Sequence, residues 1–363
     1  ACDFEWNERD WGDPDSLIAW LRERGVRLSL WENPYVWRDT AMFEEGWPKG
    51  YFAKMPDGSP AAPTEGGAAA AIIDYTNPEA VAWVQAKHRH WLERGVACFK
   101  TDYGEAVPAE AVFHNGQTGR QVHNMYPLLY NRAVFEVTES VYGEGGAVVF
   151  GRSGYAGSQR YPLNWSGDAQ ATWGGMAGAV RCGLSQAMSG AGFWAADIGG
   201  FHAPPGFTIP NDPVLYIRWA QWGLLVSHSR FHGIGAREPW RYGDDAVRIV
   251  RDFVLLRRRL RPYLWSLARE AVQTGTPVLR PLVLEYPGDP VAPHVETQFL
   301  LGPDLLVCPV FNPEGRCRVY LPAGRWQDWW DGSIHEGPRY LDMTVPLDRL
   351  PLFLREGSDR IAR

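Results

Sequence analysis

The sequence predicts an α/β protein built as a (β/α)8 barrel and followed by a C-terminal domain that we expect to be an antiparallel β-sandwich. Helices and short apolar strands alternate through residues 1–273, and polar side chains stand where these strands end. From residue 274 onward the chain changes to strand-like runs punctuated by Gly and Pro. The alternation is typical of a parallel sheet, and active sites of barrels are built at the carboxyl ends of their strands.

A repeated helix-then-strand unit supports the first domain. Residues 13–31 read DPDSLIAWLRERGVRLSLW, and residues 77–102 read NPEAVAWVQAKHRHWLERGVACFKTD. Each begins with an Asp or Asn that can cap a helix, followed by proline at the first helical position. Each helix ends at ERG, whose glycine supplies a left-handed C-terminal cap, and an apolar strand follows at once.

The other elements follow in the same order. We expect further helices near 121–142, 172–189, 212–226 and 245–273. We expect strands near 27–31, 96–101, 147–152, 161–166, 191–196 and 229–233. A barrel needs eight strands, so we expect two to lie upstream of residue 1, in an N-terminally truncated chain. An open, doubly wound sheet is the alternative, but the polar residues at the strand ends favour the barrel. The predicted domains are 1–273, the partial catalytic barrel, and 274–363.

Composition excludes several classes of partner. The net charge of −6 argues against binding nucleic acid or an anionic membrane. No apolar run of membrane-spanning length and no signal-peptide pattern occurs. Five scattered cysteines fit reduced thiols in a cytoplasmic protein better than a disulfide framework. The 18 tryptophans suggest clefts with apolar walls and polar rims, although a core could also absorb many of them.

Two carboxylates at strand ends carry the predicted chemistry. Asp102 closes the stretch CFKTD and Asp168 closes NWSGD, and a pair of acids flanking a cleft is the minimum for glycoside hydrolysis. Lys100 and Arg152 can keep Asp102 ionised, as a nucleophile requires, and Trp165 can provide an apolar wall beside Asp168. Taken alone, the KTD stretch could be a strand-end salt bridge or a turn, and Arg152 could form a structural ion pair.

The motifs CFKTDYGEAVP, GRSGYAGSQRYPLNWSGD, GAGFWAADIGGF, WGLLVSHSRFHG and LFLREGS closely resemble glycoside hydrolase family 31, and the bacterial α-xylosidase and α-glucosidase-like branch in particular. The resemblance runs nearly end to end. It implies a (β/α)8 catalytic barrel between an N-terminal β-sandwich and C-terminal β-domains. It also implies a retaining reaction through a covalent glycosyl-enzyme, without a metal or other cofactor.

The resemblance assigns roles residue by residue. It implies that Asp102 is the nucleophile and Asp168 the acid/base. The residues expected to bind substrate are Trp31, Lys100, Arg152, Trp165 and His232. Glu105 and Asp197 are expected to support the site. His228 lies four residues before His232, but no HExxH pattern accompanies the pair, so we interpret His228 as structural.

The predicted function is hydrolysis of terminal α-linked xylosyl or glucosyl residues by double displacement. Two alternatives stay open: a catalytically silent carbohydrate-binding fragment, and a transglycosylase or lyase that uses the same residues. The expected partner is an oligosaccharide or other α-glycoside, and a homo-oligomer is also open. Residues 60–71 are Ala- and Gly-rich, whereas relatives of this branch carry tryptophans there that help form the leaving-group site. The choice among xyloside, glucoside and galactoside therefore stays open.

Overall fold

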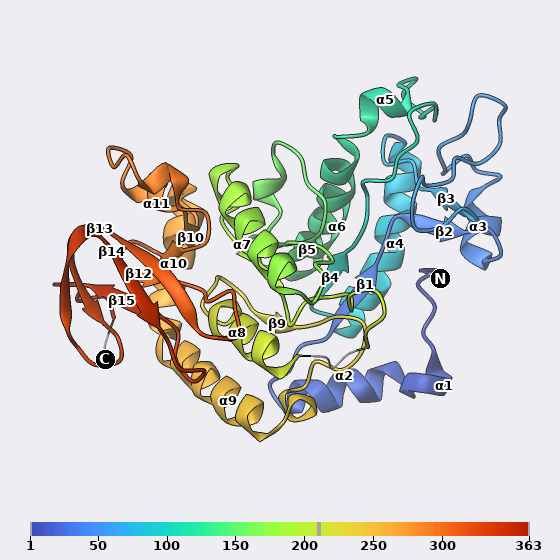
Figure 1. Ribbon diagram of the computed structural model, residues 1–363. Helices are drawn as coiled ribbons and strands as arrows, with labels where there is room; N and C mark the ends of the chain where they lie inside the picture. The colour runs from blue at the N-terminus through green and yellow to red at the C-terminus, as the bar shows by residue number, and fades with distance from the viewer. Residues whose placement is uncertain (1, 209–211, 362–363) are drawn as a thin grey trace. The chain divides into compact units, whose positions relative to one another are not determined.

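The computed structural model describes residues 2–208 and 212–361, which form two compact units (Figure 1). The first unit ends at Leu163 and the second begins at Asn164. Helices and short strands alternate through the first unit and the early part of the second, as the sequence predicts. Among the described helices, none combines the length and the apolarity that crossing a bilayer requires.

Three parallel strands form the centre of the first unit. They are β1 (Ser29–Glu32), β4 (Cys98–Thr101) and β5 (Val149–Gly151), in the order β1-β4-β5. Trp31 of β1 is level with Lys100 of β4, so the C-terminal ends of these two strands lie at one edge of the sheet. That edge is where the sequence predicts the catalytic residues.

Helices and one antiparallel strand pair complete the first unit. The pair is β2 (Tyr35–Trp37) with β3 (Ala70–Ile72), which lies partly in the Ala- and Gly-rich segment and is fully buried. The helices are α1 (Glu8–Trp11), α2 (Pro14–Glu23), α3 (Ala41–Gly46), α4 (Pro78–Arg94), α5 (Gly119–Val122) and α6 (Tyr126–Tyr142), with a 3-10 turn η1 (Ser158–Arg160). The predicted helix near 121–142 is therefore two helices, α5 and α6.

The helix caps of the repeated unit form as the sequence predicts. The carboxylate of Asp13 accepts a hydrogen bond from the backbone N–H of Ser16 (2.8 Å), and the Asn77 side chain accepts one from Glu79 (3.0 Å). Gly95 ends α4 in the left-handed conformation, with φ of +109°. Because a residue with a Cβ rarely adopts this φ, glycine is the natural stop before strand β4.

Two short parallel pairs open the second unit. Strand β6 (Asn164–Trp165) pairs with β7 (Trp194–Ala195), and β8 (Asp197–Ile198) pairs with β9 (Arg230–Phe231). The sequence predicts one strand at 191–196, and the structure instead has two short strands that pair with different partners. Strands of two residues carry too little pattern of their own, so their pairing is decided by neighbours distant in the sequence.

The helices of the second unit are α7 (Trp173–Met188), α8 (Pro213–Gly223), α9 (Asp244–Arg259), α10 (Arg261–Thr274) and α11 (Leu282–Glu285), with 3-10 turns η2 (Pro239–Tyr242) and η3 (Ala292–His294). The prediction of one long helix over 245–273 is wrong, because α9 and α10 are separated at Leu260. Pro262 explains the break. Proline has no N–H to donate, and its ring clashes with the carbonyl four residues earlier.

The C-terminal part is a six-stranded antiparallel sheet in the order β10-β11-β12-β15-β13-β14. Its strands are β10 (Leu279–Arg280), β11 (Phe299–Leu301), β12 (Leu305–Val307), β13 (Arg316–Asp328), β14 (Ile334–Thr344) and β15 (Leu352–Arg355). The antiparallel C-terminal domain that the sequence predicts is thus confirmed, and its strands are hydrogen-bonded into one continuous sheet.

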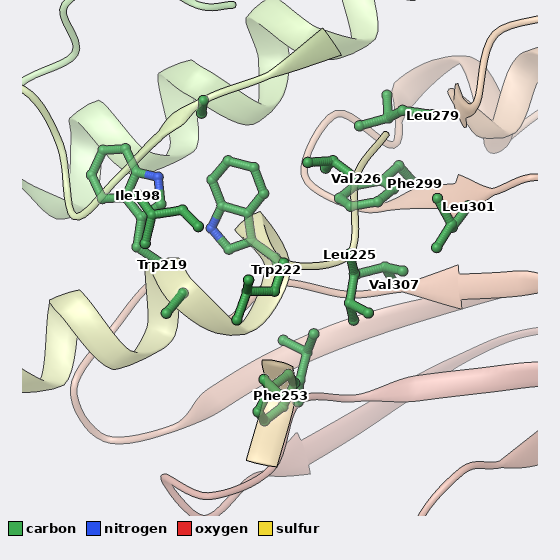
Figure 2. Close-up of a cluster of buried hydrophobic side chains, with 14 of the residues drawn as sticks. Ile198, Trp219, Trp222, Leu225, Val226, Phe253, Leu279, Phe299, Leu301 and Val307 are labelled. Carbon is green, nitrogen blue, oxygen red and sulfur yellow. The ribbon is translucent and has the colours of Figure 1, made fainter. Parts of the chain in front are cut away.

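Both faces of this sheet are covered near its middle. Along β11, Phe299 and Leu301 pack into the core that contains Trp222 of α8, whereas Leu300 packs into a separate core with Trp326. Figure 2 shows the first of these cores, in which side chains of α8 and α9 meet those of β11 and β12. Since successive residues of a strand point to opposite faces, burial of both faces explains the continuous apolar runs in this part of the sequence.

Candidate active site

Asp102 directly follows strand β4 and is almost fully buried, with 6% of its surface exposed. Its Oδ2 accepts a hydrogen bond of 2.7 Å from the indole Nε1 of Trp31, which stands near the end of β1. Its Oδ1 accepts one of 2.9 Å from the backbone N–H of Tyr103. Both oxygens are thus held in fixed positions by neutral donors.

Two cations also contact the Asp102 carboxylate. The Nζ of Lys100 lies 3.4 Å from Oδ2, and a terminal nitrogen of Arg152 donates to Oδ1 at 3.2 Å. Burial raises the pKa of Asp102, but the charge of Lys100, the indole of Trp31, the charge of Arg152 and the Tyr103 amide together outweigh it, so the pKa is lowered. The carboxylate is therefore ionised at neutral pH, as the sequence predicts from Lys100 and Arg152.

Arg152 links Asp102 to a second acid. Its other terminal nitrogen lies 2.9 Å from Oε1 of Glu105, and its guanidinium lies over the Tyr103 ring, 4.8 Å from the centroid. The structure therefore brings together five of the predicted site residues in the first unit: Trp31, Lys100, Asp102, Glu105 and Arg152.

The segment that follows Asp102 is held by a tyrosine that was not predicted from the sequence. The hydroxyl of Tyr35, at the start of β2, accepts hydrogen bonds from the backbone N–H groups of Gly104 (3.1 Å) and Ala106 (3.0 Å). Tyr35 is 2% exposed. Tyr103, directly before Gly104, has a φ of +57°, an unfavourable conformation for a residue with a Cβ that persists only where surrounding contacts enforce it.

Asn131 of α6 joins the ends of β4 and β5. Its Oδ1 accepts a hydrogen bond of 2.6 Å from the Thr101 hydroxyl, and its Nδ2 donates one of 3.0 Å to the backbone oxygen of Ser153. Thr101 precedes Asp102 and Ser153 follows Arg152, so one buried amide fixes the spacing of the two strand ends. A polar residue on a largely apolar helix face is the signal that could have identified it.

In the second unit, Asp168 lies three residues after β6 and its side chain is 22% exposed. The Nε2 of His202 lies 3.9 Å from Asp168 Oδ2. The segment carrying His202 is fixed beside Asp168 because the Phe201 N–H donates to the oxygen of Ala169 (2.6 Å) and the Ala171 N–H donates to the oxygen of His202 (2.7 Å). His202 was not predicted from the sequence.

Asp197, at the start of β8, is fully buried and forms an ion pair across the β8–β9 pair. It accepts a hydrogen bond of 2.8 Å from Nε of Arg230. The Arg230 guanidinium also lies over the ring of Trp165, 4.9 Å from the centroid. Arg230 thus connects two residues predicted from sequence, Asp197 and Trp165, and orders the strand that leads to His232.

His232 directly follows β9, and its ring lies 5.5 Å from that of Phe201. His228 is half-buried, and burial together with the charges of Arg230 and Arg257 lowers its pKa to about 3. The imidazole of His228 is therefore neutral at ordinary pH. Within residues 2–208 and 212–361, no three His, Cys, Asp or Glu side chains gather as a metal site.

Each unit thus presents polar side chains at its strand ends, and each set suits a different chemical task. The Asp102 set holds an ionised carboxylate among donors, as a nucleophile requires. The Asp168 set holds a partly exposed carboxyl group beside an imidazole and aromatic rings, which suits proton transfer to a bound group.

Comparison with known proteins gives the same order of parts. Residues 1–267 match the glycosyl hydrolases family 31 TIM-barrel domain, and residues 275–358 match the glycosyl hydrolase family 31 C-terminal domain. An α-xylosidase of Emericella nidulans is 40% identical over 367 residues, which cover 98% of this chain and 46% of that protein.

Solved structures agree. A family 31 α-xylosidase from a soil metagenome, complexed with xylose, superposes with a TM-score of 0.90 at 32% identity, covering 99% of this chain and 57% of that one. A family 31 sulfoquinovosidase from E. rectale, in complex with an aza-sugar inhibitor, gives a TM-score of 0.91 at 29% identity, covering 99% and 55%. The chain spans about half the length of these relatives. By its matched domains and its similarity over nearly its whole length, the chain belongs to glycosyl hydrolase family 31.

Proposed function

We propose that this chain carries the catalytic residues of a retaining α-glycosidase that removes terminal α-linked xylosyl groups. The observation that supports it most directly is the Asp102 carboxylate, which two cations and two N–H donors keep ionised in a nearly buried position. The indole of Trp31, which donates to one of these oxygens, is 48% exposed, so the carboxylate lies beside a side chain that solvent can reach. A carboxylate that only stabilised the fold would not need this position.

In the first step, Asp102 attacks the anomeric carbon of the substrate. A bond forms between a carboxylate oxygen and C1 while the bond from C1 to the leaving-group oxygen breaks. Asp168 gives its proton to that oxygen, so the leaving group departs as an alcohol. Trp31, Lys100 and Arg152 fix the carboxylate beforehand, which reduces the reorganisation needed during attack.

In the second step, water attacks the same carbon and releases Asp102. Asp168, now ionised, accepts a proton from the water, and the sugar leaves with its α configuration retained. This sequence needs carboxyl groups about 5–5.5 Å apart, whereas inversion needs a separation of about 6.5–9.5 Å. An experimental structure in which Asp102 and Asp168 are separated by the larger distance would contradict retention.

The proposed xylosyl specificity rests on the similarity to two α-xylosidases, one of which has a structure with xylose. Hydrolysis of sulfoquinovosides is the main alternative specificity, because the fold of the sulfoquinovosidase is equally similar. Initial rates with the 4-nitrophenyl α-glycosides of xylose, glucose and sulfoquinovose will rank the three. We expect the xyloside to have the highest kcat/KM, and a higher value for either of the others would overturn the specificity.

Two alanine variants test the assigned roles. In Asp168→Ala, a 2,4-dinitrophenyl glycoside should retain most of its glycosylation rate, because this leaving group needs no proton. Added azide should then speed release and give the α-azide. Asp102→Ala should turn over neither good nor poor leaving groups when no external nucleophile is added.

Pre-steady-state kinetics separate this proposal from the alternatives. A burst of one dinitrophenolate per active site in Asp168→Ala, followed by slow release, supports the covalent intermediate. Equal losses in both variants, whatever the leaving group, would contradict the roles. Binding of xylose without any turnover by the unsubstituted chain would favour a silent carbohydrate-binding fragment.

A further inference from the structure

A buried guanidinium lies between two segments of the second unit that carry proposed site residues. Arg237, in the segment after β9, is 4% exposed. Its Nε donates to the backbone oxygen of Gly200 (2.9 Å), and one terminal nitrogen donates to that of Phe201 (3.1 Å). Its other terminal nitrogen donates to the oxygens of Ile234 (3.3 Å) and Ala236 (3.0 Å).

Burying this guanidinium costs free energy, so its presence here calls for an explanation. Burial lowers the pKa of Arg237, and none of its side-chain donors is bonded to a carboxylate in the described part of the chain. A buried charge whose hydrogen bonds go mainly to carbonyl oxygens is costly to desolvate. Tyr216 fixes the backbone of this residue by donating its hydroxyl to the Arg237 oxygen (2.7 Å), and its ring stacks on Tyr242 at 3.8 Å.

The two segments cannot approach each other this closely with larger residues. Gly200 has a φ of +76°, and a Cβ there would lie 2.5 Å from the Cα of Ala171. A Cβ on Gly233 would lie 2.5 Å from a terminal nitrogen of Arg237 and 2.7 Å from the oxygen of Gly200. Gly233 therefore makes room for the guanidinium and for the backbone it binds, and Gly200 lets its own segment pack against Ala171.

Each segment carries an imidazole of the candidate site. His202 follows Phe201 directly and lies 3.9 Å from Asp168, while His232 precedes Gly233. The Phe201 ring contacts both, at 4.7 Å from His202 and 5.5 Å from His232. Fixing the oxygens of Gly200 and Phe201 against the segment 234–236 therefore fixes the spacing of the two imidazoles.

We propose that Arg237 is a positioning residue that holds His202 and His232 in place for binding the sugar and its leaving group. The proposal rests on the proposed function. Lysine at this position keeps the charge, but its single ammonium group cannot replace the planar guanidinium, whose nitrogens bind several carbonyls at once. Misplacement of binding groups by about 1 Å can cost about 100-fold in rate, so we expect Arg237→Lys to lower kcat/KM by about 10- to 100-fold.

Arg218 provides a matched control. It is 1% exposed, its pKa is also lowered by burial, and it donates to the backbone oxygens of Arg349 (2.7 Å) and Val345 (2.7 Å). Those carbonyls belong to the C-terminal part of the chain and not to the segments that carry His202 and His232. Arg218→Lys should therefore lower the thermal midpoint without changing KM.

The experiment compares both variants with the unsubstituted full chain by amide hydrogen exchange, by xylose affinity and by turnover of an aryl α-xyloside. We expect faster exchange in peptides covering 199–203 and 231–236 only in Arg237→Lys, with weaker xylose binding and a higher KM. Guanidinium added to Arg237→Ala should restore part of the lost kcat/KM. Unchanged exchange in both peptides, or equal kinetic losses in the two lysine variants, would overturn the proposal.

The two proposals fail in different ways. If the unsubstituted chain binds xylose but hydrolyses no α-glycoside, the proposed function fails, and the ratio of xylose affinities still decides the role of Arg237. If it binds no xylose, the sugar-binding role of Arg237 is overturned. If hydrolysis is normal and Arg237→Lys matches Arg218→Lys, the proposed function stands and the positioning role fails.

Discussion

Asp102 is charged because the cationic and N–H contacts outweigh burial, and each contact comes from a different point in the sequence. Lys100 and Tyr103 are its near neighbours, while Trp31 and Arg152 come from adjacent strand ends. Removing one contact should therefore raise the pKa of Asp102 without removing the nucleophile. Because the folded-state pKa is lowered, this carboxylate also stabilises the fold above about pH 4, and the contribution disappears as pH falls through the folded pKa.

We predict that Lys100→Met moves the acidic limb of the kcat/KM profile to higher pH. The substitution removes the strongest charge that favours the ionised form of Asp102, so a higher pH is needed to ionise it. Rates with an aryl α-xyloside between about pH 3 and 8 will give the limb. Lys87→Met, which removes a lysine that contacts Glu45, is the control. A limb that moves to lower pH, or moves equally in the control, would contradict the assignment.

At this scale the sequence was most informative where chemistry depends on neighbours within a motif. Asp102, Lys100 and Glu105 could be identified because they lie within one short stretch. Tyr35 could not, because the amides it binds lie 69 and 71 residues further along the chain. Arg237 was also missed, since its partners are backbone oxygens, which any sequence provides.

At the scale of elements, strand β2 supports the segment after β4 through one hydroxyl. Two backbone N–H groups would be left buried without an acceptor if that hydroxyl were removed. The neighbouring Tyr130 offers a contrast, because its buried hydroxyl has no hydrogen-bond partner among the described residues. Replacing each tyrosine by phenylalanine therefore distinguishes the effect of losing hydrogen bonds, at Tyr35, from the effect of losing only a hydroxyl group, at Tyr130.

We predict that Tyr35→Phe lowers the free energy of unfolding by about 1–3 kcal/mol, the usual cost of an unsatisfied buried polar group. Tyr130→Phe should change it by less than about 0.5 kcal/mol. Urea denaturation followed by tryptophan fluorescence measures both. Equal destabilisation in the two variants would mean that packing, rather than the two hydrogen bonds of Tyr35, explains the effect.

Helices were predictable where their ends are encoded locally. Asp13, Asn77 and Gly95 mark helix ends with side chains and a backbone conformation that belong to those positions. The division at Leu260 was also encoded, by Pro262, but the regular apolar spacing on both sides concealed it. The two-residue strands β7 and β8 were not separable, because nothing in 191–198 specifies two different partners.

At the scale of the whole molecule, the sequence changes character near residue 274, and we retain that point as the proposed domain boundary. The core of the second unit nevertheless continues across it, since Phe253 shares a cluster with Leu279 and Phe299 (Figure 2), and Leu267 belongs to the same cluster. Composition records where strands replace helices. It does not record which residues share a core, because that depends on which faces of the helices and strands pack against one another.

The guanidinium groups of Arg218 and Arg237 in the second unit are buried and donate to backbone carbonyls. Dissolved ions weaken the attraction between exposed charges, because the screening length falls from about 10 Å at 0.1 M salt to about 3 Å at 1 M. They have far less access to a buried cation bound to carbonyl dipoles. The anchoring of these segments should therefore be nearly independent of ionic strength.

We predict that the loss of urea stability in Arg218→Lys is the same at about 0.1 M and about 1 M NaCl. The loss in Arg94→Gln, which removes an exposed ion pair with Asp15, should shrink at the higher concentration. Urea midpoints of both variants at the two concentrations provide the check, and a strong salt dependence for Arg218→Lys would contradict it. A fold anchored in this way would keep its strand-end segments in register at high salt as in dilute buffer. Salt would then change the binding of charged substrates and not the conformation of the protein.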